Sequence, residues 1–123
     1  MKINRLVLTI FAPILLLVGT LGFVLPASMA LTSGATPYNV FHLCFGVVGL
    51  GCVASKQPGA IKGFNVGFGA IDLYQAVASF AGLWPQEHFR WKAADDVLHV
   101  LVGAALVAVG LFADRVSAPA AAR

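Results

Sequence analysis

Residues 6–55 read LVLTIFAPILLLVGTLGFVLPASMALTSGATPYNVFHLCFGVVGLGCVAS, and this stretch contains no Asp, Glu, Lys or Arg. A helix that crosses a bilayer needs about 20 predominantly apolar residues, so the stretch is long enough for two crossings. Between its apolar halves, Pro26 and Pro37 flank a run of small residues, which is typical of a loop. The stretch therefore predicts two antiparallel transmembrane helices joined by a short connection.

The rest of the chain has the same apolar character. Apolar blocks follow at residues 63–84 and 97–113. The 123-residue chain is 59% hydrophobic and 11% charged, whereas an ordinary soluble domain is about 25% charged. We predict an all-α membrane protein with a single domain, residues 1–123. Its four transmembrane helices are expected at residues 4–25, 37–55, 61–83 and 95–112, followed by a flexible tail, residues 113–123. Because these helices use most of the chain, no soluble domain remains for catalysis, and we do not expect an enzyme.

The basic residues indicate topology rather than nucleic-acid binding. The net charge is +3, but the Lys and Arg residues do not cluster, so no nucleic-acid partner is expected. One side of the predicted membrane holds Lys2, Arg5, Lys56, Lys62, Arg115 and Arg123, and the other holds only Arg90 and Lys92. Lys and Arg are enriched in cytoplasmic segments, so both termini are expected in the cytoplasm. The aromatic residues expected at the outer boundary are Tyr38, Trp84, Phe89 and Trp91. The first apolar run is longer than the core of a secretory signal, so we expect the first helix to be retained.

A repeated motif divides the chain into two halves. Asn39-Val40-Phe41-His42-Leu43, with Gly46 four residues after the histidine, recurs as Asp96-Val97-Leu98-His99-Val100, with Gly103 four residues after its histidine. All three pairs, 39 and 96, 42 and 99, and 46 and 103, have the same separation of 57 positions. We therefore predict two similar helical hairpins, related by an axis along the membrane normal. His42 and His99 would then lie at equal depth, near the outer surface.

Three interpretations of the histidine pair are open. Two histidines at one depth could ligate a haem iron or bind chlorophyll-type pigments. Gly46 and Gly103, one turn further along the same helix faces, would leave space either for a flat ligand or for a closely packed helix. Alternatively, Asn39 and Asp96 meet the imidazoles or cap the helix starts, and the pairs are structural. Proton handling is the third interpretation.

Polar residues also recur along the third predicted helix. Asn65, Asp72, Gln75 and Ser79 fall on one helical face, which should face protein. Asp72 lies near the middle of the span, where a charged side chain costs about 2.5–3.5 kcal/mol on insertion scales. Gln75 is one turn away and could hydrogen-bond the carboxyl group. Asp72 is therefore either the titrating group of a proton or cation site or a structural acid that is hydrogen-bonded across the helices or at a subunit interface.

Small residues on the helices predict close packing. Gly63 and Gly67 form a GxxxG motif on the third helix, and Gly103 lies on a smooth strip of the fourth. Such motifs support contacts within the domain, in a homo-oligomer or with other membrane subunits, and they do not distinguish these partners.

Several of these segments together resemble a known family. They are Gly19-Thr20-Leu21-Gly22-Phe23, Asn39-Val40-Phe41-His42-Leu43 with Gly46, Gly49 and Leu50, Tyr74 with Gly82-Leu83, and Asp96-Val97-Leu98-His99. They resemble small four-helix bacterial integral membrane proteins known only as a domain of unknown function, and more remotely the layout is similar to DoxX-like proteins. The resemblance implies the four-helix fold and a location in a bacterial inner membrane, and it implies no activity. Asp72 and Gln75 do not match the family pattern.

The sequence supports three functional hypotheses. The first is a structural or accessory subunit that packs in the lipid bilayer against itself or a larger membrane complex. The second is a haem- or pigment-binding protein that uses His42 and His99. The third is a proton-coupled transporter centred on Asp72.

Overall fold

The computed structural model of the protein describes residues 2–115. Its elements, in chain order, are α1 (Lys2–Val24), the 3-10 helix η1 (Ala27–Met29), α2 (Thr36–Ser55), α3 (Pro58–Ala81), α4 (Gln86–Phe89) and α5 (Ala93–Phe112). Within these residues the regular elements are all helices, as the composition predicts. The four long helices begin one to three residues earlier than expected, and the short η1 and α4 were not predicted. Most of the expected flexible tail, residues 116–123, lies outside the described residues.

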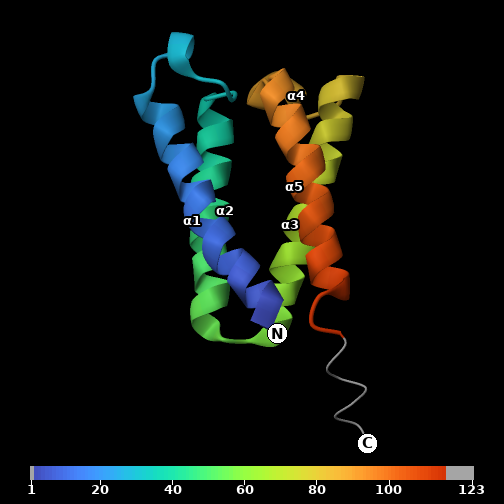
Figure 1. Cartoon of the computed structure of the whole chain (residues 1–123). Helices are drawn as coiled ribbons and strands as arrows, with labels where there is room; N and C mark the ends of the chain where they lie inside the picture. Colours follow the sequence, from blue (N-terminus) through green and yellow to red (C-terminus); the bar gives the residue numbers. More distant parts are fainter. Residues whose placement is uncertain (1, 116–123) are drawn as a thin grey trace, which may run out of the picture.

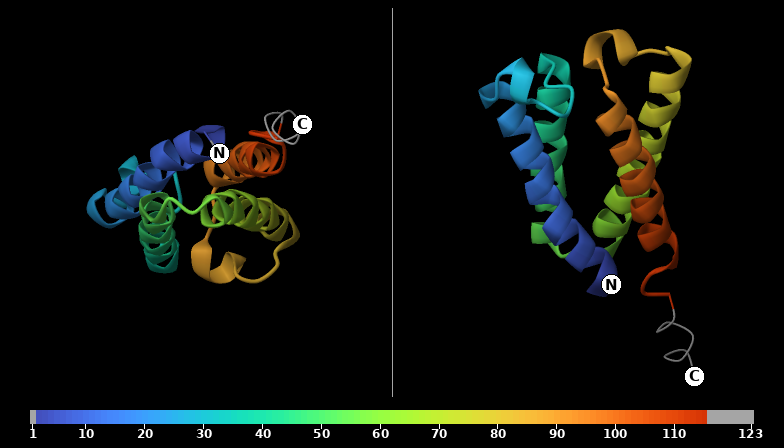
Figure 2. Two further views of the ribbon diagram at one scale, coloured as in Figure 1. Left: turned by 90° about the horizontal axis from the view of Figure 1, so that it is seen from below. Right: turned by 45° about the horizontal axis from the view of Figure 1, so that its top comes forward.

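The long helices form two antiparallel pairs, which we call the N-terminal hairpin (α1 and α2) and the C-terminal hairpin (α3 and α5). In each hairpin the two helices lie side by side along most of their length (Figure 1). The hairpins lie closest at the end that holds the start of α1 and the end of α5, which we call the terminal end. They separate toward the opposite end, the α4 end, as Figure 1 and the right view of Figure 2 show.

Local sequence explains where the helices begin and end. Pro37 and Pro58 stand in the first turns of α2 and α3, where a missing N–H costs no helical hydrogen bond. Two left-handed residues end these helices, Lys56 with φ 59° and Gly82 with φ 67°. Glycine adopts this conformation without a steric penalty, so Gly82 is well suited to end α3.

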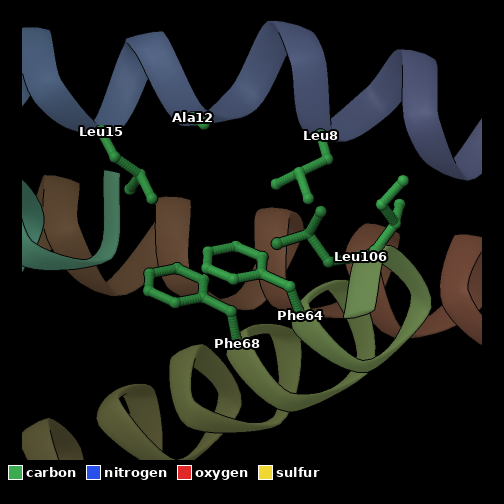
Figure 3. Packing of buried hydrophobic residues seen from close by; sticks show 7 residues of the cluster. Leu8, Ala12, Leu15, Phe64, Phe68 and Leu106 are labelled. Carbon is green, nitrogen blue, oxygen red and sulfur yellow. The ribbon is translucent and has the colours of Figure 1, made fainter. Parts of the chain in front are cut away.

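An apolar core joins the two hairpins. Leu8, Ala12 and Leu15 on one face of α1 lie against α3 and α5 (Figure 3). From α3, Phe64 and Phe68 stack with their ring centroids 5.4 Å apart. Leucine-to-alanine changes at such buried sites cost about 2–5 kcal/mol, so this core stabilises the contact between the hairpins.

Gly46 and Gly103 allow close helix packing, which is one of the two alternatives that the sequence left open. A β-carbon at Gly103 would lie 2.9 Å from the backbone oxygen of Gly69, and one at Gly46 would lie 2.6 Å from the Leu16 side chain. The space beside these two glycines is therefore filled by neighbouring helices, and it does not hold a flat ligand.

Gly63 and Gly67 differ from this pair. A β-carbon at either position would meet no other atom within 4 Å. This face of α3 points away from the rest of the described chain, so the GxxxG motif makes no helix contact within it. The motif is therefore available for contact with another copy of the chain or with another subunit.

Three helices, α1, α2 and α5, are long and apolar enough to cross a membrane, with mean hydropathies of 2.5, 1.5 and 1.9. Among the described helices, α3 is of similar length but is not one of these three. The sequence analysis expected four such spans. The reason for the difference is the polar face of α3, because Asn65, Asp72 and Gln75 lower its mean hydropathy. All three are buried, which confirms that this face is directed toward protein.

A polar cluster joins the hairpins at the terminal end. The Asn65 amide nitrogen donates to Asn4 Oδ1 at 3.0 Å, and the Asn4 amide nitrogen donates to Asp114 Oδ2 at 3.1 Å. The backbone N–H groups of Ile3 and Asn4 also donate to the Asp114 carboxyl group, both at 3.0 Å. These two backbone hydrogen bonds lower the pKa of Asp114 to about 2. Asp114 therefore caps the start of α1, and this part of the expected flexible tail is docked.

Candidate functional site

A cavity of about 110 Å³ lies between the two hairpins, and side chains of all four long helices line it. Most of its surface is apolar, and Phe11 and Phe68 form part of it. Its polar lining consists of Thr32, Tyr38, His42, Asp72, Asp95 and His99. We call this the central chamber. The structure thus brings both predicted histidines and the predicted intramembrane acid to one cavity.

A buried hydrogen bond between the hairpins borders the central chamber. Tyr38, in the first turn of α2, donates from its hydroxyl group to Asp95 Oδ1 at 2.7 Å. Asp95 lies in the first turn of α5, and its other carboxyl oxygen accepts the backbone N–H of Lys92 at 2.9 Å. Tyr38 and Asp95 are 2% and 1% exposed, so both partners are shielded from solvent. The pair therefore caps α5 and links the hairpins at the same time.

His42 presents a hydrogen-bond acceptor to the chamber. Its Nδ1 lies 2.7 Å from the backbone oxygen of Tyr38, four residues earlier on α2. A carbonyl oxygen only accepts, so the Nδ1 atom carries the proton and Nε2 of the neutral ring is an acceptor. The Tyr38 ring, 4.2 Å away between centroids, holds the imidazole from one side.

His99 is buried with an unsatisfied ring nitrogen. Its imidazole is 5% exposed and meets the Trp91 ring edge-on at 5.9 Å. Within residues 2–115, no hydrogen-bond partner reaches its Nδ1 atom. An unpaired buried polar atom costs about 1–3 kcal/mol, and such atoms commonly bind water or a ligand. His99 therefore offers hydrogen-bonding capacity that the described protein does not use.

Asp72 is the unpaired acid of the chamber. Its side chain is 4% exposed, lines the cavity from the middle of α3, and has no hydrogen-bond partner among the described residues. The bond considered for Gln75 is not formed, because both amide atoms of Gln75 are buried without a partner in the described part of the chain. Gln75 also lies outside the chamber lining. Asp72 therefore faces the cavity without the hydrogen bond from Gln75 that the sequence analysis considered.

Asn39 and Asp96 do not contact the imidazoles of the chamber through any hydrogen bond of the described structure. Asn39 donates to the backbone oxygen of Gly34 at 2.9 Å and packs against Gly22. Asp96 is half-buried, and its Oδ1 has no partner within residues 2–115. Asn39 therefore does not cap α2, which begins without a side-chain cap, and it binds the loop before the helix instead.

The preceding residues contribute to the chamber instead. Tyr38 and Asp95 lie one position before Asn39 and Asp96, and they are also 57 positions apart. Tyr38 and Trp91, both expected near the outer boundary, are buried within the protein. Because Tyr and Asp are chemically dissimilar, a repeat of similar residues at a separation of 57 positions does not reveal this pair.

The dimensions of the chamber limit what it can hold. Pockets for drug-sized ligands are about 300–1,000 Å³, so a cavity of about 110 Å³ is far below this range. A tetrapyrrole such as haem could reach both histidines only if the two hairpins separated. The residues therefore fit a small guest better than the haem or pigment considered from the sequence.

Metal coordination has little support from the side chains. Among the described residues, no group of three or more His, Cys, Asp and Glu side chains could hold a metal ion. The chamber instead offers hydrogen-bonding groups, an unpaired acid and apolar walls. This chemistry suits transfer of a proton or binding of a small polar guest.

Comparisons of the chain with protein-family models, curated proteins and solved structures gave no match. The fold and the chamber define the protein by class: it is helical in its described part and has three helices that could cross a membrane by length and composition.

Proposed function

We propose that the protein is a small proton-coupled transporter, with Asp72 as its titrating group and His42 and His99 as partners in the same site. One observation carries this proposal: an unpaired acid and two histidines, which come from different helices, line a single cavity. Ionisable residues within a membrane are costly and most often mark a pathway for ions or protons. A purely structural acid would be expected to hydrogen-bond another residue, and Asp72 has no such bond to any residue that the structure describes.

The proposal includes four membrane crossings, with α3 as the fourth. A 24-residue helix is about 36 Å long at 1.5 Å per residue and exceeds a hydrocarbon core of about 30 Å. Its polar face is buried against the protein, while its exposed face carries apolar residues such as Ile71, Val77 and Phe80. A helix of this kind is compatible with lipid although its mean hydropathy is modest.

The proposed topology keeps both termini in the cytoplasm of a bacterial inner membrane. The basic segments Lys2 to Arg5 and Lys56 to Lys62 lie at the terminal end, as does Arg115. The excess of positive charge there supports a cytoplasmic terminal end. The central chamber would then lie toward the outer half of the membrane.

Transport can be tested in proteoliposomes that contain an internal pH-sensitive dye. An inward proton gradient is imposed, and internal pH is followed while solutes of different classes are added outside: small ammonium ions, carboxylates, neutral amino acids, sugars and alkali cations. We expect a protein-dependent pH change with one class, which Asp72→Asn reduces at least tenfold.

Asp96→Asn is the matched control, because it changes an acid of α5 that does not line the chamber and should leave the pH change within twofold. Circular dichroism spectra of both variants check that they are folded. The proposal is wrong if no solute class gives a pH change above protein-free liposomes, or if Asp72→Asn transports as well as the original protein.

A structural or accessory subunit is the second candidate, and the outward-facing Gly63 and Gly67 favour it. Glycines at this spacing let two membrane helices approach closely, and the described chain leaves this face of α3 uncovered. The resemblance to small four-helix membrane proteins of unknown function is compatible with either candidate. Cross-linking in native membranes that is lost in Gly63→Leu would support association through α3, with a second copy or with another subunit. Unchanged cross-linking would exclude it.

A further inference from the structure

The central chamber has the charge and shape of a site for a small organic cation. Asp72 and Asp95 are acidic, and no Lys or Arg side chain of residues 2–115 lines the cavity. Asp95 already accepts two hydrogen bonds, whereas Asp72 accepts none within residues 2–115. Asp72 is therefore the acid of the chamber that is left to bind a guest, and the two acids together disfavour an anionic guest.

The other polar groups suit a guest that donates hydrogen bonds. His42 Nε2 is an acceptor because Nδ1 is used by the backbone oxygen of Tyr38. The Nδ1 atom of His99 is buried and unpaired in the described structure. An ammonium group has three N–H donors and no acceptor, which matches one carboxylate and the nearby imidazole acceptors. The Nδ1 atom of His99 can accept a hydrogen bond from the guest when the Nε2 atom of the same ring carries the proton.

The walls of the chamber suit a short hydrocarbon tail. Phe11 and Phe68 line it with their rings 5.6 Å apart and edge to face, beside the aliphatic Leu98 and Val102. The alkyl part of a guest gains from leaving water for these apolar walls. Metal cations lack such a tail, and no metal-binding group of side chains is present among the described residues.

The volume sets the size of the guest. A closed apolar cavity of about 150 Å³ accommodates benzene. The chamber, at about 110 Å³, admits a guest of a few non-hydrogen atoms. Methylammonium to propylammonium fall in this range, and tetraethylammonium is too large.

We infer that the central chamber binds a small primary alkylammonium ion, with its charged group at Asp72 and its alkyl group against Phe11 and Phe68. The inference rests on the proposed transport function, for which it names the class of solute.

The test is direct binding, because uncharged amines cross lipid and complicate flux. The full-length protein in phosphatidylcholine nanodiscs is titrated with propylammonium and followed by saturation-transfer NMR. The comparison ligands are 1-propanol, which has the same shape without the charge, propionate, which has the opposite charge, and tetraethylammonium, which exceeds the volume. We expect binding of propylammonium only, weakened at least tenfold in Asp72→Asn and unchanged in Asp96→Asn.

A second variant keeps the test decisive if Asp72→Asn does not fold. Val102→Phe narrows the chamber without touching its acid, and it should weaken propylammonium binding at least tenfold while methylammonium binding persists. Equal binding of propanol or propionate, or propylammonium binding that neither variant changes, overturns the inference.

The two proposals fail in different ways. Propylammonium binding in nanodiscs, without any protein-dependent pH change in liposomes, would overturn the proposal that the protein is a transporter. The inferred class of ligand would still stand. A pH change driven by another solute class, without propylammonium binding, would overturn the inferred class of ligand. The proposal that the protein is a transporter would still stand.

Discussion

Replacing Tyr38 with phenylalanine should weaken the link between the two hairpins. The change keeps the ring, which lies 4.2 Å from His42, and removes only the hydroxyl group that donates to Asp95 at 2.7 Å. A hydrogen bond to a carboxylate contributes about 1.5–3 kcal/mol, and its loss leaves a buried acceptor with one partner fewer. We expect the free energy of unfolding to fall by about 1.5–3 kcal/mol, which is about ten- to hundredfold in the unfolding equilibrium.

Tyr74→Phe provides a matched control. Tyr74 also donates a 2.7 Å hydrogen bond, to the backbone oxygen of Trp84, but this bond is exposed and lies within the C-terminal hairpin. A neutral and exposed hydrogen bond contributes about 0.5–1.5 kcal/mol at most. The free energy of unfolding should therefore fall clearly less in Tyr74→Phe than in Tyr38→Phe. The contact between the hairpins should be unchanged in Tyr74→Phe.

Both variants can be measured by titrating detergent-solubilised protein with SDS and following helix content and tryptophan fluorescence. A double-mutant cycle with Asp95→Asn isolates the coupling between the two side chains. If Tyr38→Phe and Tyr74→Phe lower stability equally, or if the cycle gives no coupling, the bond does not hold the hairpins together as we argue.

Two further predictions concern helix packing and the terminal end. Gly103→Leu should cost about 3 kcal/mol, at the upper end of overpacking, because its β-carbon would lie 2.9 Å from the Gly69 backbone oxygen. Gly63→Leu meets open space and should stay within about 0.5 kcal/mol, so similar losses in an SDS titration would contradict the packing. Asp114 has a pKa lowered to about 2 in the folded protein. An acid of this kind stabilises the folded state above its unfolded pKa of about 3.9, and the stabilisation is lost as pH falls toward 2. The melting temperature should therefore fall less steeply between pH 4 and 2 in Asp114→Asn than in the original protein, and equal slopes would count against the cap.

Much of the fold follows from local sequence. The length of each apolar stretch and the prolines that flank them predict the long helices to within a few residues, because hydrophobic length and helix-breaking residues act locally. The stripe of Asn65, Asp72 and Gln75 on one face also predicts burial, since a polar face cannot face lipid without cost. The short α4 was missed because the four residues Gln86–Phe89 have no periodic pattern to detect.

The candidate site is only partly predictable. The sequence identifies His42, His99 and Asp72 as notable, because histidines in a repeated motif and an acid in a membrane helix are rare. It does not identify the bond from Tyr38 to Asp95, since neighbouring residues differ by 100° around a helix and a motif does not set how each helix is rotated. It also does not reveal that Asn4, Asn65 and Asp114 meet, because they are brought together only when the hairpins close at one end.

The sequence by itself therefore determines the composition, the helices and the faces that must be buried, because these depend on residues close together in the chain. Tertiary structure decides which buried faces meet. It brings the two histidines and Asp72 to one chamber of about 110 Å³, turns Gly63 and Gly67 outward, and sets Gly103 against α3. The physical reason is that the rotation and crossing of the four long helices depend on the packing of all of them together.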